Sequence, residues 1–316
     1  MIRSALPQHR TRAALGCRTE TKVKPSSSSY LPVRGLRYHV RTWGDPSAPK
    51  VILLHGAQDV SASWQFTVDA MKKDWHFIAP DWRGYGMSQW SGSHSYWQPD
   101  LTADLNVLLA HFSPDEPARL MTHSLGGNIV GVYAGLKPER VRLFINVEGY
   151  NVPSVTIEDT PKRYTAWLDA TAKEDAPPRT YPGYEAFAER MRKGNPRLTP
   201  ERALFLAQHW CKEAPATVAG GGVMLRSDPA YGRGSPMCYR LDEQSQYWSR
   251  VSAPTLWVEG GQSEWLHILL KTGEYARRRA CYSNLTVERF EQAGHNVHHE
   301  EPERLAELCE AFLLKN

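Results

Sequence analysis

Short apolar runs that alternate with helical patterns constrain the fold of this chain more than any other feature of its sequence. From residue 31 onward, runs of four to six largely apolar residues recur between segments of helical periodicity. Continuous apolarity in a short run is typical of strands buried on both faces, as in a parallel sheet. Six runs have this character: VILLHG (51–56), HFIAPDW (76–82), RLMTHS (119–124), VRLFINVEG (141–149), PTLWVEGG (254–261) and LTVERF (285–290).

Helix candidates lie between these runs. RYHVRTWG (37–44) alternates apolar and polar residues, which suits an exposed edge strand. The expected helices cover SASWQFTVDAMKK (61–73), PDLTADLNVLLAHF (99–112), LGGNIVGVYAGL (125–136) and EPERLAELCEAFLLK (301–315). This alternation predicts an α/β fold with an open, mostly parallel sheet flanked by helices on both sides.

One long segment interrupts the alternation. Residues 150–250 contain no convincing buried strand but carry helical patterns such as PGYEAFAERMRK (182–193) and TPERALFLAQHWCKE (199–213). We therefore expect a helical insertion, a cap or lid, at 150–250. The core would then consist of residues 30–149 and 251–316.

The first 29 residues differ in composition from the rest of the chain. They hold six basic residues against the single acidic Glu20 and end in KPSSSS. We expect a disordered basic extension. An organelle-targeting peptide is the alternative, because such segments are rich in Arg and Ser and poor in acidic residues.

Composition excludes several classes of protein. The 316 residues are 41% apolar and carry a formal net charge of +4, which favours neither nucleic acid nor an acidic partner. No apolar run approaches the length of a membrane span. Five cysteines without a C-x-x-C pair suit reduced thiols, so we expect a cytoplasmic protein. We also expect a monomer or homodimer whose partner is a small-molecule substrate.

The polar residues that end the apolar runs are the candidates for chemistry, because sites in open α/β sheets form at the carboxyl ends of the strands. MTHSLGGN (121–128) resembles the G-x-S-x-G turn that exposes a nucleophilic serine, with Thr122 in place of the first glycine. Ser124 is the predicted nucleophile. His295, in QAGHNVHHEEP (292–302), is the predicted base that takes its proton.

Two glutamates compete for the acid that would orient His295. Glu148 ends an apolar strand run, where burial is costly unless the carboxylate is paired, whereas Glu264 lies in a looser Gly-rich loop. We favour Glu148 and leave Glu264 open. The backbone N–H groups of Ala57 and Leu125 are the expected oxyanion donors.

Two further histidines, His298 and His299, follow the predicted base closely. We expect surface-loop histidines here, or one that packs against the lid. H-x-x-H-H without a carboxylate or cysteine at ligand spacing is a weak metal signal, so neither a metal nor a cofactor is expected.

These motifs, in this order, resemble the α/β-hydrolase superfamily. They are H-G (55–56), DWRGYGMS (81–88), HSLGG (123–127), a strand-end acid and G-H (294–295). The likeness covers about residues 30–316 and is greatest to the branch of esterases, epoxide hydrolases and haloalkane dehalogenases. It implies an eight-stranded sheet, a helical cap after the sixth strand, and roles for Ser124, His295, Ala57 and Leu125.

The resemblance also bears on the reaction. Epoxide hydrolases and dehalogenases of this layout attack with an aspartate, whereas Ser124 implies acyl chemistry. Dehalogenase relatives that use a glutamate place it after the sixth strand, where Glu148 falls. We expect a serine hydrolase of small, fairly apolar carboxylic esters, thioesters or lactones. The alternatives are a carbon–carbon bond hydrolase of ring-cleavage products and a non-catalytic descendant that binds a small ligand.

Overall fold

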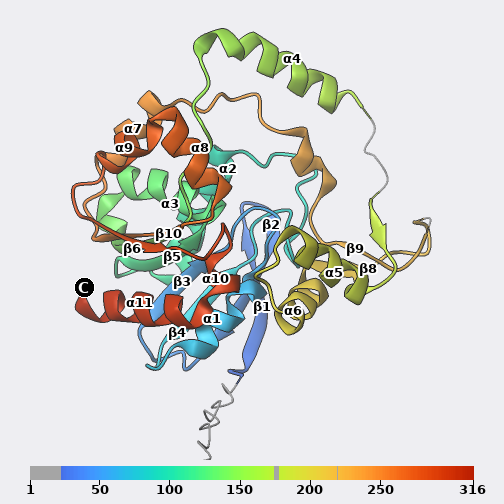
Figure 1. Ribbon diagram of the computed structural model, residues 1–316, viewed down its shortest axis with the longest axis horizontal. Helices are drawn as coiled ribbons and strands as arrows, with labels where there is room; N and C mark the ends of the chain where they lie inside the picture. Colours follow the sequence, from blue (N-terminus) through green and yellow to red (C-terminus); the bar gives the residue numbers. More distant parts are fainter. Residues whose placement is uncertain (1–22, 174–177, 219) are drawn as a thin grey trace, which may run out of the picture.

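The computed structural model describes residues 23–173, 178–218 and 220–316, and a mixed sheet of eight strands lies at its centre (Figure 1). The strands follow the order β1-β2-β4-β3-β5-β6-β10-β11. Their bounds are β1 Ser26–Val33, β2 Leu36–Trp43, β3 Lys50–Leu54, β4 His76–Pro80, β5 Ala118–His123, β6 Val141–Val147, β10 Thr255–Gly260 and β11 Leu285–Phe290. The two pairings of β2, with β1 and with β4, are antiparallel, and the other pairs are parallel.

The strands expected from the sequence are all present, and the predicted fold class is confirmed. The expectation that residues 37–44 form an exposed edge strand is wrong, because β2 lies between β1 and β4 and is partly buried. One strand of the central sheet was missed. β1 contains four consecutive serines, SSSSYLPV, and pairs with β2 from Ser26 onward. The core therefore begins at least four residues before the expected boundary at residue 30, because an exposed edge strand needs backbone partners but little apolar surface. The rest of the expected disordered extension, residues 1–22, lies outside the described residues.

Helices cover both faces of the sheet (Figure 1). One face carries α2 Gln98–Phe112, α3 Leu125–Leu136, α7 Leu241–Trp248, α8 Glu264–Thr272 and α9 Glu274–Arg279. The other carries α1 Gln65–Ala70, α10 Val297–Glu300 and α11 Pro302–Lys315. Strand residues alternate between the two cores: Ile52 and Leu54 of β3 pack on the first, whereas Val51 and Leu53 pack on the second. Burial on both faces explains the continuous apolar runs of the sequence.

The segment between β6 and β10 is built differently from the rest. Its elements are α4 Thr160–Thr171, β7 Thr180–Tyr181, α5 Tyr184–Gly194, α6 Pro200–Trp210, β8 Cys211–Glu213, β9 Val223–Leu225 and α7, with short 3-10 helices at Ile157–Asp159 and Pro229–Arg233. Thr199 caps α6 by accepting from the N–H of Arg202 at 3.3 Å. α4 lies at the outer edge of the molecule and has no buried residue (Figure 1).

Two details of this segment differ from expectation. The helix expected over 199–213 ends at Trp210, and Cys211–Glu213 is the outer strand of a three-stranded sheet in the order β7-β9-β8. Such short strands give no periodicity to detect. In addition, α7 packs on the main core through Leu241 and Trp248, although it lies within the insertion expected at 150–250.

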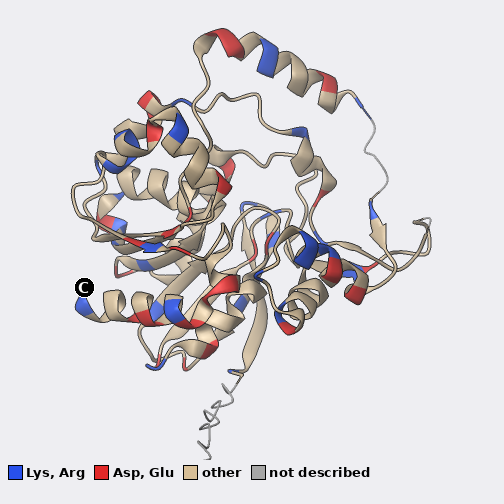
Figure 2. Cartoon of the chain, viewed as in Figure 1, with Lys and Arg blue, Asp and Glu red and all other residues tan. Residues whose placement is uncertain are grey.

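Charged residues are interspersed over the molecule. Figure 2 shows that α4, α5 and α11 each carry both basic and acidic residues. This distribution agrees with the small formal net charge of +4. No helix among the described residues is long and apolar enough to cross a membrane.

Gly135 allows α3 and α7 to approach closely, and its replacement tests that packing. A Cβ at Gly135 would overlap the carbonyl oxygen of Tyr247. Alanine is the better helix former by about 1 kcal/mol. We nevertheless expect Gly135→Ala to lower the free energy of unfolding by about 1–3 kcal/mol, because a backbone atom cannot move aside cheaply.

The matched control is Gly194→Ala at the end of α5, where a Cβ would meet nothing within 4 Å. It is expected to change the free energy of unfolding by less than about 0.5 kcal/mol. Urea unfolding followed by circular dichroism measures both variants. Equal stability of Gly135→Ala and Gly194→Ala would contradict the close packing of α7 on α3.

Candidate active site

Ser124 occupies a sharp turn between β5 and α3. Its backbone has φ 48° and ψ −113°, a conformation that costs energy for a non-glycine residue. Two glycines make the turn possible. A Cβ at Gly126 would overlap the carbonyl oxygen of Leu54, and one at Gly127 would overlap the side chain of Asn146. The strand–turn–helix context expected of a G-x-S-x-G-like motif is therefore present.

Thr122 stands where that motif has its first glycine. The residue is fully buried, and its hydroxyl donates to the carbonyl oxygen of Ile145 on the neighbouring strand β6 at 3.0 Å. The hydroxyl is thus satisfied, and the β-branched side chain suits a strand position. The departure from the motif is accommodated by packing.

The structure brings Ser124, His295 and Glu148 together in a row. Ser124 Oγ lies 3.0 Å from His295 Nε2, and His295 Nδ1 lies 3.0 Å from Glu148 Oε2. The three residues come from the ends of β5 and β6 and from the loop after β11. These distances allow a proton to pass from the serine to the imidazole, while the carboxylate holds the imidazole tautomer that accepts it.

Glu148 is only 2% exposed, and hydrogen bonds compensate the burial of its charge. Oε1 accepts from the N–H of Gly260 and from the hydroxyl of Tyr150, both at 2.6 Å. Oε2 accepts from the hydroxyl of Ser263 as well as facing His295. Burial, followed by the charge of Glu148, raises the pKa of Tyr150 well above its usual value, so Tyr150 remains a donor.

The competing acid, Glu264, lies elsewhere. It is exposed in the first turn of α8, and no described residue forms a hydrogen bond or ion pair with its carboxylate. Glu259 is fully buried and pairs with Arg289 at 2.9 Å. Of the three glutamates in this region, Glu148 is the one in contact with His295.

The two expected oxyanion donors follow the neighbouring strands β3 and β5. Leu125 follows Ser124 and begins α3, and Ala57 lies in the loop after β3. Within the described chain, neither backbone N–H has a hydrogen-bond partner. Both groups are therefore free to donate to a bound oxygen atom.

Other polar residues at strand ends have structural partners. His55 is buried, and its Nε2 accepts from the N–H of Trp82 at 2.9 Å. Asp81 accepts from the N–H of Ser61 at 2.6 Å and contacts Nδ1 of His39 at 2.8 Å. Burial alone would raise the pKa of Asp81, but His39 and the other donors lower it to about 2. These residues organise the surrounding loops.

His298 and His299 are not surface-loop histidines, contrary to expectation. They are 0% and 2% exposed and lie on α10, against Asp59 of the loop after β3. Burial lowers the pKa of His299 well below its usual value, as does the neighbouring His298. His123 is similarly buried, and burial with the charges of His298 and His295 lowers its pKa well below the usual value.

Sequence reasoning missed Asp59, Tyr150 and Ser263. Tyr150 and Ser263 hold Glu148, and Asp59 anchors the buried histidines. The position of Asp59, a charged residue shortly after the first buried strand, was a usable signal. Nothing in the sequence alone indicates that Ser263, a helix cap, also turns toward Glu148.

A cavity of about 280 Å³ opens beside the loop after β3. Its lining includes Gln58 and Tyr85 from the core and Met224, Leu225 and Tyr231 from the segment between β6 and β10. The ring centroids of Tyr85 and Tyr231 lie 5.2 Å apart. The cavity is small and mainly apolar, with Gln58 adjacent in sequence to Ala57.

Comparison with known proteins agrees with this geometry. The chain matches the family model described as the alpha/beta hydrolase fold over residues 49–302. That match covers most of the chain, so the protein belongs to the α/β-hydrolase fold family.

Individual relatives are more distant. A serine hydrolase-like protein of Danio rerio is 23% identical over 302 residues, which cover 93% of this chain and 90% of that protein. Epoxide hydrolase A of Mycobacterium tuberculosis is 34% identical over 133 residues, 42% of this chain and 40% of that protein. The solved thioesterase domain from the curacin biosynthetic pathway has a TM-score of 0.78 at 22% identity, covering 90% of this chain and 99% of that domain.

Thr122 provides a test of the turn. We expect Thr122→Val to lower the free energy of unfolding by about 1 kcal/mol, because only the hydrogen bond to Ile145 is lost. Thr122→Gly should cost about 2–3 kcal/mol, since it also leaves a void and frees the unfolded backbone. Urea unfolding measures both variants. A Thr122→Gly protein as stable as the wild type would show that threonine strains the turn.

Proposed function

We propose that this protein is a serine hydrolase that cleaves small, fairly apolar carboxylic esters, thioesters or lactones through an acyl-enzyme. The observation that carries the proposal is the unbroken row of contacts from Ser124 Oγ through His295 to Glu148. A serine hydroxyl is a poor nucleophile alone, and an adjacent base oriented by a carboxylate activates it.

The proposed reaction follows from this row. Ser124 Oγ attacks the substrate carbonyl carbon while its proton moves to His295 Nε2. The N–H groups of Ala57 and Leu125 stabilise the tetrahedral oxyanion. Collapse releases the alcohol or thiol, which takes the proton from His295 and leaves an acyl group on Ser124. A water molecule then attacks the acyl carbon while its proton moves to His295. The second tetrahedral intermediate collapses, the carboxylic acid leaves, and His295 returns the proton to Ser124 Oγ.

Glu148 stays ionised in this mechanism and stabilises the imidazolium that forms at His295. The donors from Gly260, Tyr150 and Ser263 keep its carboxylate in place. Several donors are needed because a carboxylate held by fewer hydrogen bonds could rotate. It would then no longer fix the tautomer of His295 that carries the proton on Nδ1.

The proposed substrate is small and apolar. The cavity beside the loop after β3 has a volume of about 280 Å³, at the lower limit for ligand pockets. Trp265, 39% exposed, lies with its ring 6.4 Å from that of His295 and offers a second apolar surface. The cavity lining also includes Arg179 and Asp228, so its size is the part of this observation that bears on the substrate. Both features favour a short acyl or alcohol group over a long one.

We also propose that the segment between β6 and the start of α7 acts as a cap over this site. Its contacts with the loops of the site include two hydrogen bonds. Trp210 Nε1 donates to Asp59 Oδ1 at 2.9 Å, and Asn195 donates to Glu300 at 2.8 Å. Residues 174–177 and 219 of this segment lie outside the described residues.

The carbon–carbon hydrolase alternative needs cationic side chains that grip a substrate carboxylate. Two arginines of the segment between β6 and β10 already donate to backbone carbonyl groups. Arg163 donates to the carbonyl of Ser235 at 3.0 Å, and Arg226 donates to that of Cys211 at 2.9 Å. This observation favours ester-type substrates. Faster turnover of a ring-cleavage diketone than of esters would reverse the preference.

A panel of p-nitrophenyl esters tests the proposal. We expect Ser124→Ala to lower kcat by at least about 1,000-fold and Glu148→Gln by about 100-fold or more, because each breaks the unit that activates the nucleophile. Glu264→Gln is the matched control, an identical substitution on an exposed glutamate. It should change kcat/KM by less than about threefold.

Two outcomes would contradict the assignments. A collapse of turnover in Glu264→Gln with retention in Glu148→Gln would move the acid to Glu264. Saturable ligand binding without turnover of any ester by the wild type would favour a non-catalytic descendant.

A further inference from the structure

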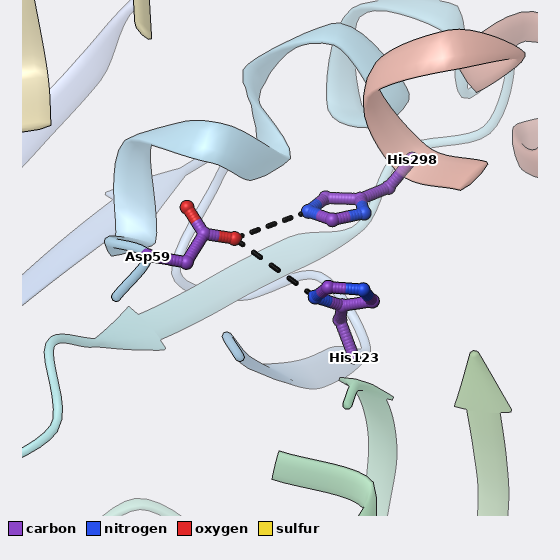
Figure 3. Close-up of side chains that lie close together, drawn as sticks. All are labelled: Asp59, His123 and His298. Carbon is purple, nitrogen blue, oxygen red and sulfur yellow. Dashed lines mark hydrogen bonds and ion pairs between the residues drawn. The ribbon is translucent and has the colours of Figure 1, made fainter. Parts of the chain in front are cut away.

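A second cluster of chemically active side chains lies behind the row formed by Ser124, His295 and Glu148. Asp59, His123 and His298 converge from three separate elements, and one ligand atom of each lies within 4.8 Å of the others (Figure 3). Asp59 belongs to the loop after β3, His123 ends β5 and His298 lies on α10. They are 3%, 3% and 0% exposed.

One oxygen atom of Asp59 is the centre of the cluster. Oδ2 lies 3.2 Å from His298 Nε2, and 4.0 Å from His123 Nδ1. His299 Nε2 lies 3.8 Å from the same oxygen. The other oxygen, Oδ1, is occupied, since it accepts from the N–H of Val60 at 2.8 Å and from Trp210 Nε1 at 2.9 Å.

The hydrogen-bonding of His123 cannot be completed by the protein alone. Its Nε2 lies 2.9 Å from the carbonyl oxygen of His295, so this nitrogen carries the proton and donates. A neutral ring then presents a bare lone pair at Nδ1. That atom is buried without a hydrogen-bond partner, although it points at Asp59 (Figure 3). A lone pair facing a carboxylate is unfavourable unless a cation lies between them.

The other imidazoles leave the same kind of deficit. His298 Nδ1 and His299 Nε2 are buried without hydrogen-bond partners. His298 already contacts Asp59 through Nε2, so the nitrogens that face Asp59 without a hydrogen-bond partner are His123 Nδ1 and His299 Nε2. Native proteins satisfy nearly all buried polar atoms, so these two nitrogens need an explanation. A bound cation would accept the lone pairs that face Asp59.

We propose that Asp59, His123 and His298 bind a divalent transition-metal ion, for which zinc is the expected species. Two imidazole nitrogens and one carboxylate oxygen form a donor set that zinc prefers. His299 Nε2, which lies 3.8 Å from Asp59 Oδ2, is a further candidate ligand. Tetrahedral zinc with bonds of about 2.0–2.1 Å holds its ligand atoms about 3.4 Å apart. The separations of 3.2, 3.8 and 4.0 Å from Asp59 Oδ2 need only a small contraction.

The surroundings also suit a metal site. Ligating histidines usually donate their second N–H to a carbonyl group, and His123 does so with His295. The carboxylate of Asp59 is oriented by Val60 and Trp210. The weak H-x-x-H-H signal in the sequence lacked a carboxylate, and the fold supplies one from a residue 239 positions away from His298.

The ion would connect the loops that carry the proposed catalytic groups. Asp59 is two residues after Ala57, His123 precedes Ser124, and His298 is three residues after His295. A closed site of this kind contributes to folding and positions loops without touching substrate. Metal binding is therefore expected to raise the unfolding temperature, with a rise that depends on metal concentration.

The test uses the full chain. Because the site is closed, the protein is first unfolded in guanidinium with a chelator so that any bound metal is removed. It is then refolded without metal and titrated with ZnCl₂. We expect one equivalent of zinc by elemental mass spectrometry after desalting, and a higher unfolding temperature. Asp59→Asn and His298→Gln should weaken zinc binding by about 100-fold or more. His111→Asn, an exposed histidine of α2, is the control and should bind as the wild type does.

Ser124→Ala separates this inference from the proposed function, since it should retain the full equivalent of zinc even if no ester is cleaved. The visible absorption spectrum of Co²⁺ bound to the wild-type protein is a second measurement, and it does not require that any variant folds. We expect intense visible bands, which are typical of four-coordinate Co²⁺. Absence of stoichiometric zinc and of these cobalt bands would overturn the proposal. So would loss of binding in His295→Gln with retention in His298→Gln, because the metal would then sit on the proposed catalytic base.

Discussion

The buried carboxylate of Glu148 is the interaction on which the arrangement of the site depends. A charge at 2% exposure is tolerated only where donors surround it, and here they come from β10, from the residue before α8 and from Tyr150. These bonds tie the end of β6 to the end of β10. The same carboxylate then fixes the imidazole of His295. The carboxylate of Glu148 therefore sets the relative positions of strands β6 and β10 and of the loop that carries His295.

Backbone strain gathers at the same edge of the sheet. Positive φ angles occur at Gln58, Ser124 and Glu148, which follow the neighbouring strands β3, β5 and β6. Non-glycine residues adopt such angles at a cost, and that cost is most often found at functional sites. The turns re-aim each side chain away from the strand direction. Helices on both faces supply the packing that holds these turns in place.

Much of this architecture is predictable from the sequence because burial on both faces leaves a strong signal. Seven of the strands in the central sheet are predictable from apolar or alternating runs in the sequence. The order of the motifs also identifies Ser124 and His295 as neighbours before any coordinates are known. Glu148 could be favoured over Glu264 because a glutamate at the end of a buried strand needs a partner.

What the sequence hides are features made by backbone pairing and by distant contacts. β1 is a run of serines whose stability comes from its ladder with β2, and the β7-β9-β8 sheet is too short for periodicity. The buried positions of His298 and His299 depend on Asp59, which no local pattern connects to them. Ser263 likewise reaches Glu148 only once β10 lies beside β6.

The most direct measurement of the central claim is peptide mass spectrometry of the protein after treatment with a fluorophosphonate, which reacts with activated serines. The account predicts one phosphonyl adduct, on the peptide that contains Ser124, formed by the native protein and lost after unfolding. No adduct on the native protein, or an adduct on a different serine, would contradict the assignment of Ser124 as the activated nucleophile.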